Sequence, residues 1–146
     1  MRLHIFTIGK AKLPFARAGI EEYAKRLRAW GGVEITELKA GARAQESAAL
    51  LARSDGLFRV ALDERGDQIT SRELAAKLTA WEHLRAKGVA FLIGGADGHG
   101  DELRDAADWQ WSLGKLTLQH ELALVVLLEQ LYRARSINAG APYHRG

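Results

Sequence analysis

A short apolar segment that runs directly into a glycine-rich turn constrains the fold of this chain more than any other feature. Residues Val89–Ile93 are all apolar, with a β-branched residue at each end, and Gly94, Gly95 and Gly98 follow. A strand that is apolar on both faces is typical of a parallel sheet covered by helices. Glycines let the backbone turn tightly and approach a ligand, and ligands collect at the carboxyl ends of such strands. The turn is therefore a candidate binding site, although a ligand-free tight turn would have the same pattern.

Strand-like and helix-like segments alternate along the rest of the chain. Strands are expected at residues 3–8, 33–38, 57–62, 89–93 and 109–113. Helices are expected at residues 14–30, 44–53, 71–88, 101–107 and 120–134, and residues 136–146 are expected to form a tail. This order predicts an α/β fold with a mostly parallel sheet and helices on both faces. A length of 146 residues predicts one domain spanning 1–146.

Composition excludes several classes of protein. The chain has no cysteine, which rules out disulfides and thiolate metal sites, and its histidines show no paired metal-ligand spacing. No apolar run approaches the length of a membrane span, and the first residues lack an export signal. We therefore expect a cytoplasmic protein with no metal and no membrane association.

The charges are unevenly distributed. Net charge is +5 in residues 1–53, −5 in residues 54–131 and +3 in residues 132–146. If the two basic ends meet in space, they form a surface suited to a polyanion such as RNA. Ordinary solvated charge is the alternative.

Two phosphate-binding signatures fail on inspection. The dinucleotide fingerprint begins with Gly98 and Gly100, but Leu103 stands where its last glycine is required. A Walker loop fails because Leu116 follows Gly114-Lys115 and Trp109 occupies the first glycine position. A nucleotide-dependent oxidoreductase is therefore disfavoured.

The last expected helix has almost no polar face before Glu129. A helix that is apolar all round is buried on more than one side. It predicts either a subunit interface, most simply of a two-fold dimer, or a helix buried within the monomer.

Five segments together resemble the RlmH family of the SPOUT class of RNA methyltransferases, which methylates N3 of a pseudouridine in 23S ribosomal RNA. They are Leu62-Asp63, Leu92-Ile93-Gly94-Gly95-x-x-Gly98, Trp111-Ser112-Leu113-x-x-Leu116-Thr117-Leu118-x-His120, Glu129-Gln130-Leu131-Tyr132-Arg133-Ala134 and Pro142-Tyr143-His144-Arg145. The chain departs from the family at Ala96-Asp97, where Pro-Glu is usual.

The resemblance implies a SPOUT-type fold with a C-terminal trefoil knot, a feature that pattern reasoning alone would not suggest. It also implies S-adenosyl-L-methionine as cofactor, bound bent in the knot. The cofactor pocket carried over from the family consists of Leu62, Gly94, Leu113, Gly114, Lys115, Leu116, Thr117 and Leu118.

The resemblance further implies a homodimer acting on 23S rRNA within the ribosome, with a substrate site that spans two subunits. His144, Tyr143 and Arg133 are the expected catalytic residues, with His144 as proton acceptor, and Arg145 and His120 are expected to bind substrate. The basic residues expected to face RNA are Lys10, Lys12, Arg17, Lys25, Arg26, Arg28, Lys39 and Arg43. A non-catalytic RNA- or ribosome-binding module on the same fold is the alternative.

Overall fold

Five parallel strands form one sheet in the computed structural model, which describes residues 1–144. The strands are β1 (Arg2–Ile8), β2 (Glu34–Leu38), β3 (Phe58–Asp67), β4 (Gly88–Ile93) and β5 (Trp109–Trp111). The helices are α1 (Pro14–Leu27), α2 (Arg43–Arg53), α3 (Ser71–Trp81), α4 (Asp101–Ala106) and α5 (His120–Ala139), with 3-10 turns η1 (Arg28–Trp30) and η2 (Pro142–His144). The strand order is β2-β1-β4-β3-β5, so the predicted parallel α/β architecture is confirmed.

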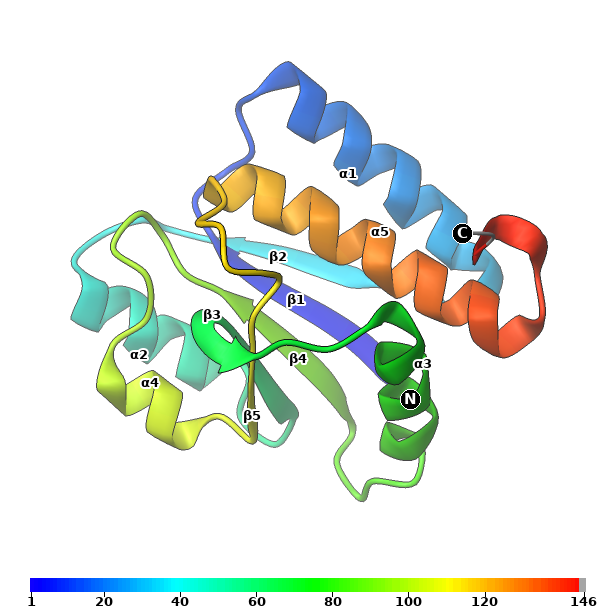
Figure 1. Ribbon diagram of the computed structural model, residues 1–146. Coiled ribbons are helices and arrows are strands. Elements are labelled where there is room, and N and C mark those ends of the chain that lie inside the picture. The colour runs from blue at the N-terminus through cyan, green and yellow to red at the C-terminus, as the bar shows by residue number, and fades with distance from the viewer. Residues whose placement is uncertain (145–146) are drawn as a thin grey trace.

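Helices cover both faces of the sheet (Figure 1). The side chains of α1, α3 and α5 build one apolar core with alternate residues of the strands, including Ile5 and Phe91. Those of α2 and α4 build a second core around Phe6 and Leu92. Every residue of β4 is buried, which explains why its sequence is apolar on both faces.

Helix α5 is longer than its sequence pattern predicts. It continues through Ala139 and ends at Gly140, whose backbone is left-handed with φ of 70°. The expectation that a tail starts at residue 136 is therefore wrong, because Ser136 is fully buried and its hydroxyl donates to the Tyr132 carbonyl. Helix α3 is shorter than expected, because it ends at Trp81 rather than near Gly88.

Helix α5 lies between α1 and α3, and this position explains part of its apolar surface. Leu124, Leu127, Leu128 and Leu131 are buried within the monomer. On the α1 side, a Cβ at Gly19 would lie 3.0 Å from Cγ1 of Val125, so the missing side chain of Gly19 lets the two helices approach closely. The monomer-core interpretation thus accounts for this side of α5.

Strand β3 continues beyond the sheet and crosses the segment that leads from β5 to α5 (Figure 1). The pairing of β3 with β5 shifts register between Leu62 and Asp67, and the Ser112 N–H donates to the Asp67 carbonyl at 2.8 Å. Gly66 is required at this crossing, since a Cβ there would lie 2.5 Å from the Gln110 backbone. None of the helices described in residues 1–144 has the length and hydropathy of a membrane span.

Candidate functional site

A cavity of about 530 Å³ opens at the carboxyl ends of β3, β4 and β5. Three segments enclose most of it: the end of β3, the glycine turn after β4, and the loop between β5 and α5. The glycine turn thus borders a cavity at the edge of the sheet where the sequence placed a binding site.

The glycine turn is tightly closed. The Gly98 N–H donates to the Gly95 carbonyl at 3.0 Å, and Gly98 has a φ of 69°, a conformation that suits glycine. A Cβ on Gly94 would lie 3.2 Å from the Gly98 oxygen. The backbone can therefore stay close to the cavity only with glycine at these positions.

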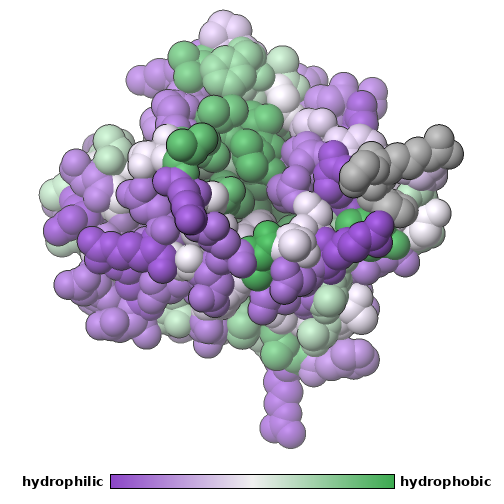
Figure 2. Space-filling model, viewed as in Figure 1, coloured by the Kyte–Doolittle hydropathy of each residue, from purple (hydrophilic) through white to green (hydrophobic). Residues whose placement is uncertain are grey.

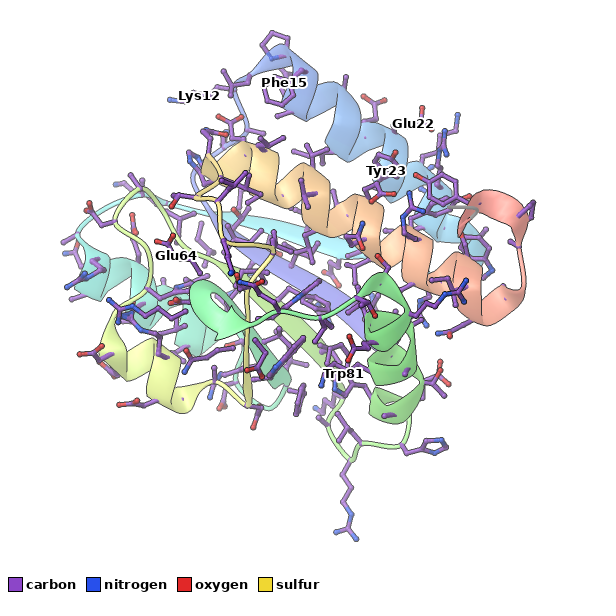
Figure 3. The ribbon with its side chains drawn as sticks, viewed as in Figure 1. Lys12, Phe15, Glu22, Tyr23, Glu64 and Trp81 are labelled. Carbon is purple, nitrogen blue, oxygen red and sulfur yellow. The ribbon has the colours of Figure 1, made fainter. Side chains whose placement is uncertain are left out.

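The loop after β5 is held by its own polar side chains. The Ser112 hydroxyl donates to the Gly114 carbonyl at 2.7 Å, and the Gly114 N–H donates back to that hydroxyl oxygen at 3.2 Å. Thr117 donates to Glu64 at 2.7 Å, which ties the loop to the extended part of β3. Glu64 projects beside this loop in Figure 3.

Most of the residues predicted to bind cofactor line this cavity. They are Leu62, Gly94, Leu113, Gly114, Leu116, Thr117 and Leu118, and His120 joins them at the start of α5. Lys115 does not line the cavity, and its side chain is exposed. A backbone contact from Lys115 stays a prediction.

The sequence did not predict the buried ion pair in the lining of the cavity. Asp63 and Arg104 form an ion pair of 3.7 Å with side chains only 9% and 12% exposed, and Arg104 also donates to the His99 carbonyl. His99 itself lines the cavity and is buried, and its Nε2 donates to the Leu92 carbonyl at 2.9 Å. Burial lowers the pKa of His99, so the ring is neutral and its Nδ1 is an acceptor.

The family resemblance included the Leu62-Asp63 pair, whereas the sequence assigned no role to His99, because the histidines lack metal-ligand spacing. The position of His99 directly after the glycine turn was the one available signal. The structure adds Arg43, Arg65 and Arg104 to the cavity lining, three cations from separate segments of the chain.

The predicted catalytic residues lie elsewhere. Arg133 pairs with Glu129 at 2.9 Å, and the Tyr143 hydroxyl donates to the same carboxylate at 2.9 Å. The Tyr143 and Tyr23 hydroxyls are 3.1 Å apart, and Tyr23 points from α1 toward this end of α5 (Figure 3). Arg26 stacks over the ring of Tyr143, with the guanidinium carbon 5.8 Å from the ring centre. We call Tyr23, Arg26, Glu129, Arg133 and Tyr143 the tail cluster.

Burial raises the pKa of Tyr143, and its hydrogen bonds with Tyr23 and Glu129 add to the shift. Tyr143 therefore remains protonated at neutral pH and serves as a hydrogen-bond donor rather than a base. His144 closes η2, but its side chain and all of Arg145 lie outside the described part of the chain.

Arg133 of the tail cluster lies 13 positions after His120 at the cavity along α5. At the rise of an α-helix this is about 20 Å. The structure therefore brings the predicted cofactor residues together in one place and the tail cluster in another, and no side chain bridges them within the described part of one chain. Among the described residues, no group of three or more histidine, aspartate or glutamate side chains is arranged to hold a metal ion.

The N-terminal and C-terminal segments meet at the tail cluster, since α1 supplies Tyr23 and Arg26 and α5 with η2 supplies the rest. The basic ends predicted from the charge distribution thus come together at this point.

Comparisons with known proteins place these features in one family. The family described as "Predicted SPOUT methyltransferase" matches residues 1–144. "Ribosomal RNA large subunit methyltransferase H" of Deinococcus deserti is 50% identical over 145 residues, covering 99% of this chain and 100% of the relative. Proteins of that name from Thermus thermophilus and Deinococcus radiodurans are 47% and 48% identical, over 99% and 100% of this chain and 99% and 100% of their own lengths.

Solved structures agree at the level of fold. A probable methylase family protein of Haemophilus influenzae Rd KW20 matches with a TM-score of 0.58 and 12% identity over 99% of this chain and 70% of its own. The tRNA (m1G37) methyltransferase of Aquifex aeolicus matches with a TM-score of 0.55 and 14% identity over 91% and 70%.

Proposed function

The chain belongs to the SPOUT methyltransferase family, and on that premise we propose that it methylates N3 of a pseudouridine in 23S rRNA. That it is a large-subunit ribosomal RNA methyltransferase that uses S-adenosyl-L-methionine follows from the family and from relatives of that name at 46–50% identity. The observation that carries the proposal is the cavity formed jointly by the glycine turn and the Leu113–Leu118 loop.

The cavity has the composition of a site for an adenosyl group. Leucine side chains at 62, 113, 116 and 118 can flank the faces of an adenine ring, while backbone N–H and C=O groups of residues 113–118 satisfy its polar edge. When bound, the donor supplies a methyl group on a sulfonium, which is transferred by in-line displacement. The protein's task is then to hold the nucleophile in line with that methyl group.

N3 of a uracil ring is weakly acidic and must lose its proton to attack well. We assign this proton to His144, with Tyr143 positioning the base as a donor and Arg133 stabilising the N3 anion. The protonated state of Tyr143 supports its role as a donor, and the ion pair with Glu129 positions the Arg133 guanidinium group beside Tyr143. His120 and Arg145 are assigned to substrate binding.

The distance between the two sites supports a homodimer. Within one chain the tail cluster is about 20 Å from the cavity along α5, so a second subunit must deliver it if both act on one nucleotide. A surface for this contact is available. Figure 2 shows apolar side chains gathered over α1 and the first half of α5.

We define this apolar face by Leu13 and Phe15 at the start of α1 and by Leu122 and Val126 on α5, which are exposed or half-buried. Phe15 is 55% exposed, and an exposed group of large apolar side chains is typical of an interaction surface. Light scattering tests the dimer. Phe15→Asp is expected to leave donor binding intact and to shift the mass toward that of one chain, whereas a monomeric wild-type protein would refute the composite site.

The decisive experiment combines two assays on the full chain. Calorimetric titration with S-adenosyl-L-methionine should show saturable binding, with NAD as the negative control. Ribosomes from a strain lacking the modification should then gain one methyl group, located by mass spectrometry of 23S rRNA digests. Donor binding without methylation of ribosomes or of free 23S rRNA would instead favour a non-catalytic module.

The proposal also covers where the enzyme acts, its domain organisation and its knot. The enzyme acts on the assembled ribosome in the cytoplasm, and residues 1–146 form one domain. The C-terminal chain is knotted, which is supported by the crossing of β3 and the loop after β5, where Ser112 bonds to Asp67. A crystal structure traced without a gap from residue 58 to residue 139 tests the knot.

A further inference from the structure

Arg43 and Arg65 are the two arginines of the cavity lining that form no ion pair within residues 1–144, and Arg43 is the one that α2 supplies. Its side chain is exposed and lines the cavity from the first position of α2. No carboxylate of residues 1–144 lies within 4.0 Å of its guanidinium group, whereas Arg104 is paired with both Asp63 and Asp101.

The position of Arg43 is fixed by its surroundings. The start of α2 lies next to the loop that joins β4 to α4 (Figure 1). A Cβ on Gly100 would lie 4.0 Å from Nε of Arg43, so the guanidinium group lies beside this loop. The buried Glu46, one turn along α2, accepts the Gly41 N–H at 3.0 Å and anchors the approach to the helix.

Arg43 also lies on the opposite side of the glycine turn from the loop proposed to hold adenine. Arg43 lies near the Gly100 end of the cavity, whereas the loop of residues 113–118 borders its other side. The amino-acid portion of a donor whose adenine is held by that loop must occupy the rest of the cavity, which Arg43 borders. That portion ends in a carboxylate and an ammonium group.

We propose that Arg43 binds the carboxylate of the methyl donor. A guanidinium group presents two parallel N–H donors that match a carboxylate, and such charge-assisted pairs are stronger than neutral hydrogen bonds. Asp63, Glu64 and Asp97 also line the cavity and provide negative charge for the ammonium and the sulfonium. The inference rests on the proposed function, because it requires the donor to occupy this cavity.

A comparison of two ligands on two proteins isolates this contact. S-Adenosyl-L-methionine and its decarboxylated analogue share the adenosyl, sulfonium and amino groups and differ only in the carboxylate. For Arg43→Gln, we expect the Kd of the intact donor to rise about tenfold, in line with the lower range for hydrogen bonds to charged groups. The Kd of the decarboxylated analogue should stay unchanged.

Two matched variants serve as controls. Arg53→Gln removes the same charge from the last position of α2, about 15 Å along the helix, and should alter neither affinity. Arg65→Gln removes another exposed cation of the cavity lining and should leave the ratio of the two affinities as in wild type.

The outcomes distinguish a failure of the proposed function from a failure of the contact between Arg43 and the carboxylate. If wild-type protein binds neither ligand, the proposed function fails before Arg43 is tested. If wild type binds and Arg43→Gln weakens both ligands equally or neither, the carboxylate contact is refuted. A loss of ribosome binding with unchanged donor affinity would assign Arg43 to an RNA phosphate instead, and a selective loss in Arg65→Gln would move the contact to that residue.

Discussion

Replacing Gly94 with valine tests the location of the donor site most directly. A Cβ on Gly94 would lie 3.1 Å from the carbonyl carbon of Gly98 and 3.2 Å from Nδ1 of His99. Carbon atoms prefer separations of about 3.5–4.0 Å, so the turn must shift by a few tenths of an ångström to accept even this atom. Valine adds two methyl groups to it and forces a larger displacement of the turn.

The expected cost has two opposing parts. Overpacking of this kind destabilises a protein by about 1–3 kcal/mol. Gly94 does not have a positive φ, so its replacement restricts the unfolded chain and returns about 0.4–1 kcal/mol. The net loss of about 1–2 kcal/mol should lower Tm by about 3–6 °C in a chain of this size and leave the variant folded.

Donor affinity should fall much further than stability. The displaced turn no longer presents its backbone to the donor, and losing two or three hydrogen bonds of about 1 kcal/mol each raises Kd about 100-fold. Calorimetry measures this, and circular dichroism confirms the fold. Gly100→Ala is the control, because a Cβ there has only Ser47 at 3.8 Å and Arg43 at 4.0 Å as neighbours. A folded Gly94→Val variant with wild-type donor affinity would refute the placement of the donor in this cavity.

Three further predictions follow from particular contacts. Thr70→Ala removes the side chain that accepts the Glu73 N–H at 3.1 Å, so thermal melts should show a loss of about 1 kcal/mol with donor affinity unchanged. His99 faces Asp63, Arg104 and Glu46, and its pKa is lower in the folded protein than in the unfolded chain. The folded state is therefore most stable above the unfolded pKa and loses stability as pH falls toward the folded pKa. The free energy of urea unfolding should differ less between pH 7.5 and pH 5 in His99→Leu than in the wild type. Deleting residues 143–146 should abolish ribosome methylation and spare donor binding. Mixed dimers of this truncated chain and the Gly94→Val chain should regain activity. An active truncated enzyme would contradict the role of the tail.

The strand and helix order could be predicted because it depends on local periodicity. The apolar pattern of residues 89–93 predicts a strand covered on both faces, and every residue of β4 is buried. Boundaries failed where tertiary contacts decide them. A tail was expected from residue 136, yet α5 continues there because Ser136 is buried and Ile137 packs against the core.

The cavity could be predicted only in part for the same reason. The glycine turn and the loop after β5 carry recognisable motifs, so their residues were found. Arg43, Arg104 and His99 belong to no motif and reach the cavity through the packing of α2 and α4 on the sheet. The meeting of Asp63 with Arg104 depends on strand order, which joins residues that are 41 positions apart in sequence.

Helix α5 is tied to neighbouring segments near its start and at its middle. At its start, Glu121 accepts the backbone N–H groups of Lys12 and Leu13, which ties α5 to the segment before α1. In the middle of α5, Glu129 pairs with Arg133 and accepts the Tyr143 hydroxyl. A helix packed between α1 and α3 cannot shorten, so the tail cluster of one chain cannot reach the cavity of the same chain by rearranging side chains. Either the tail cluster has no part in methyl transfer, or catalysis requires two chains, each supplying what the other lacks.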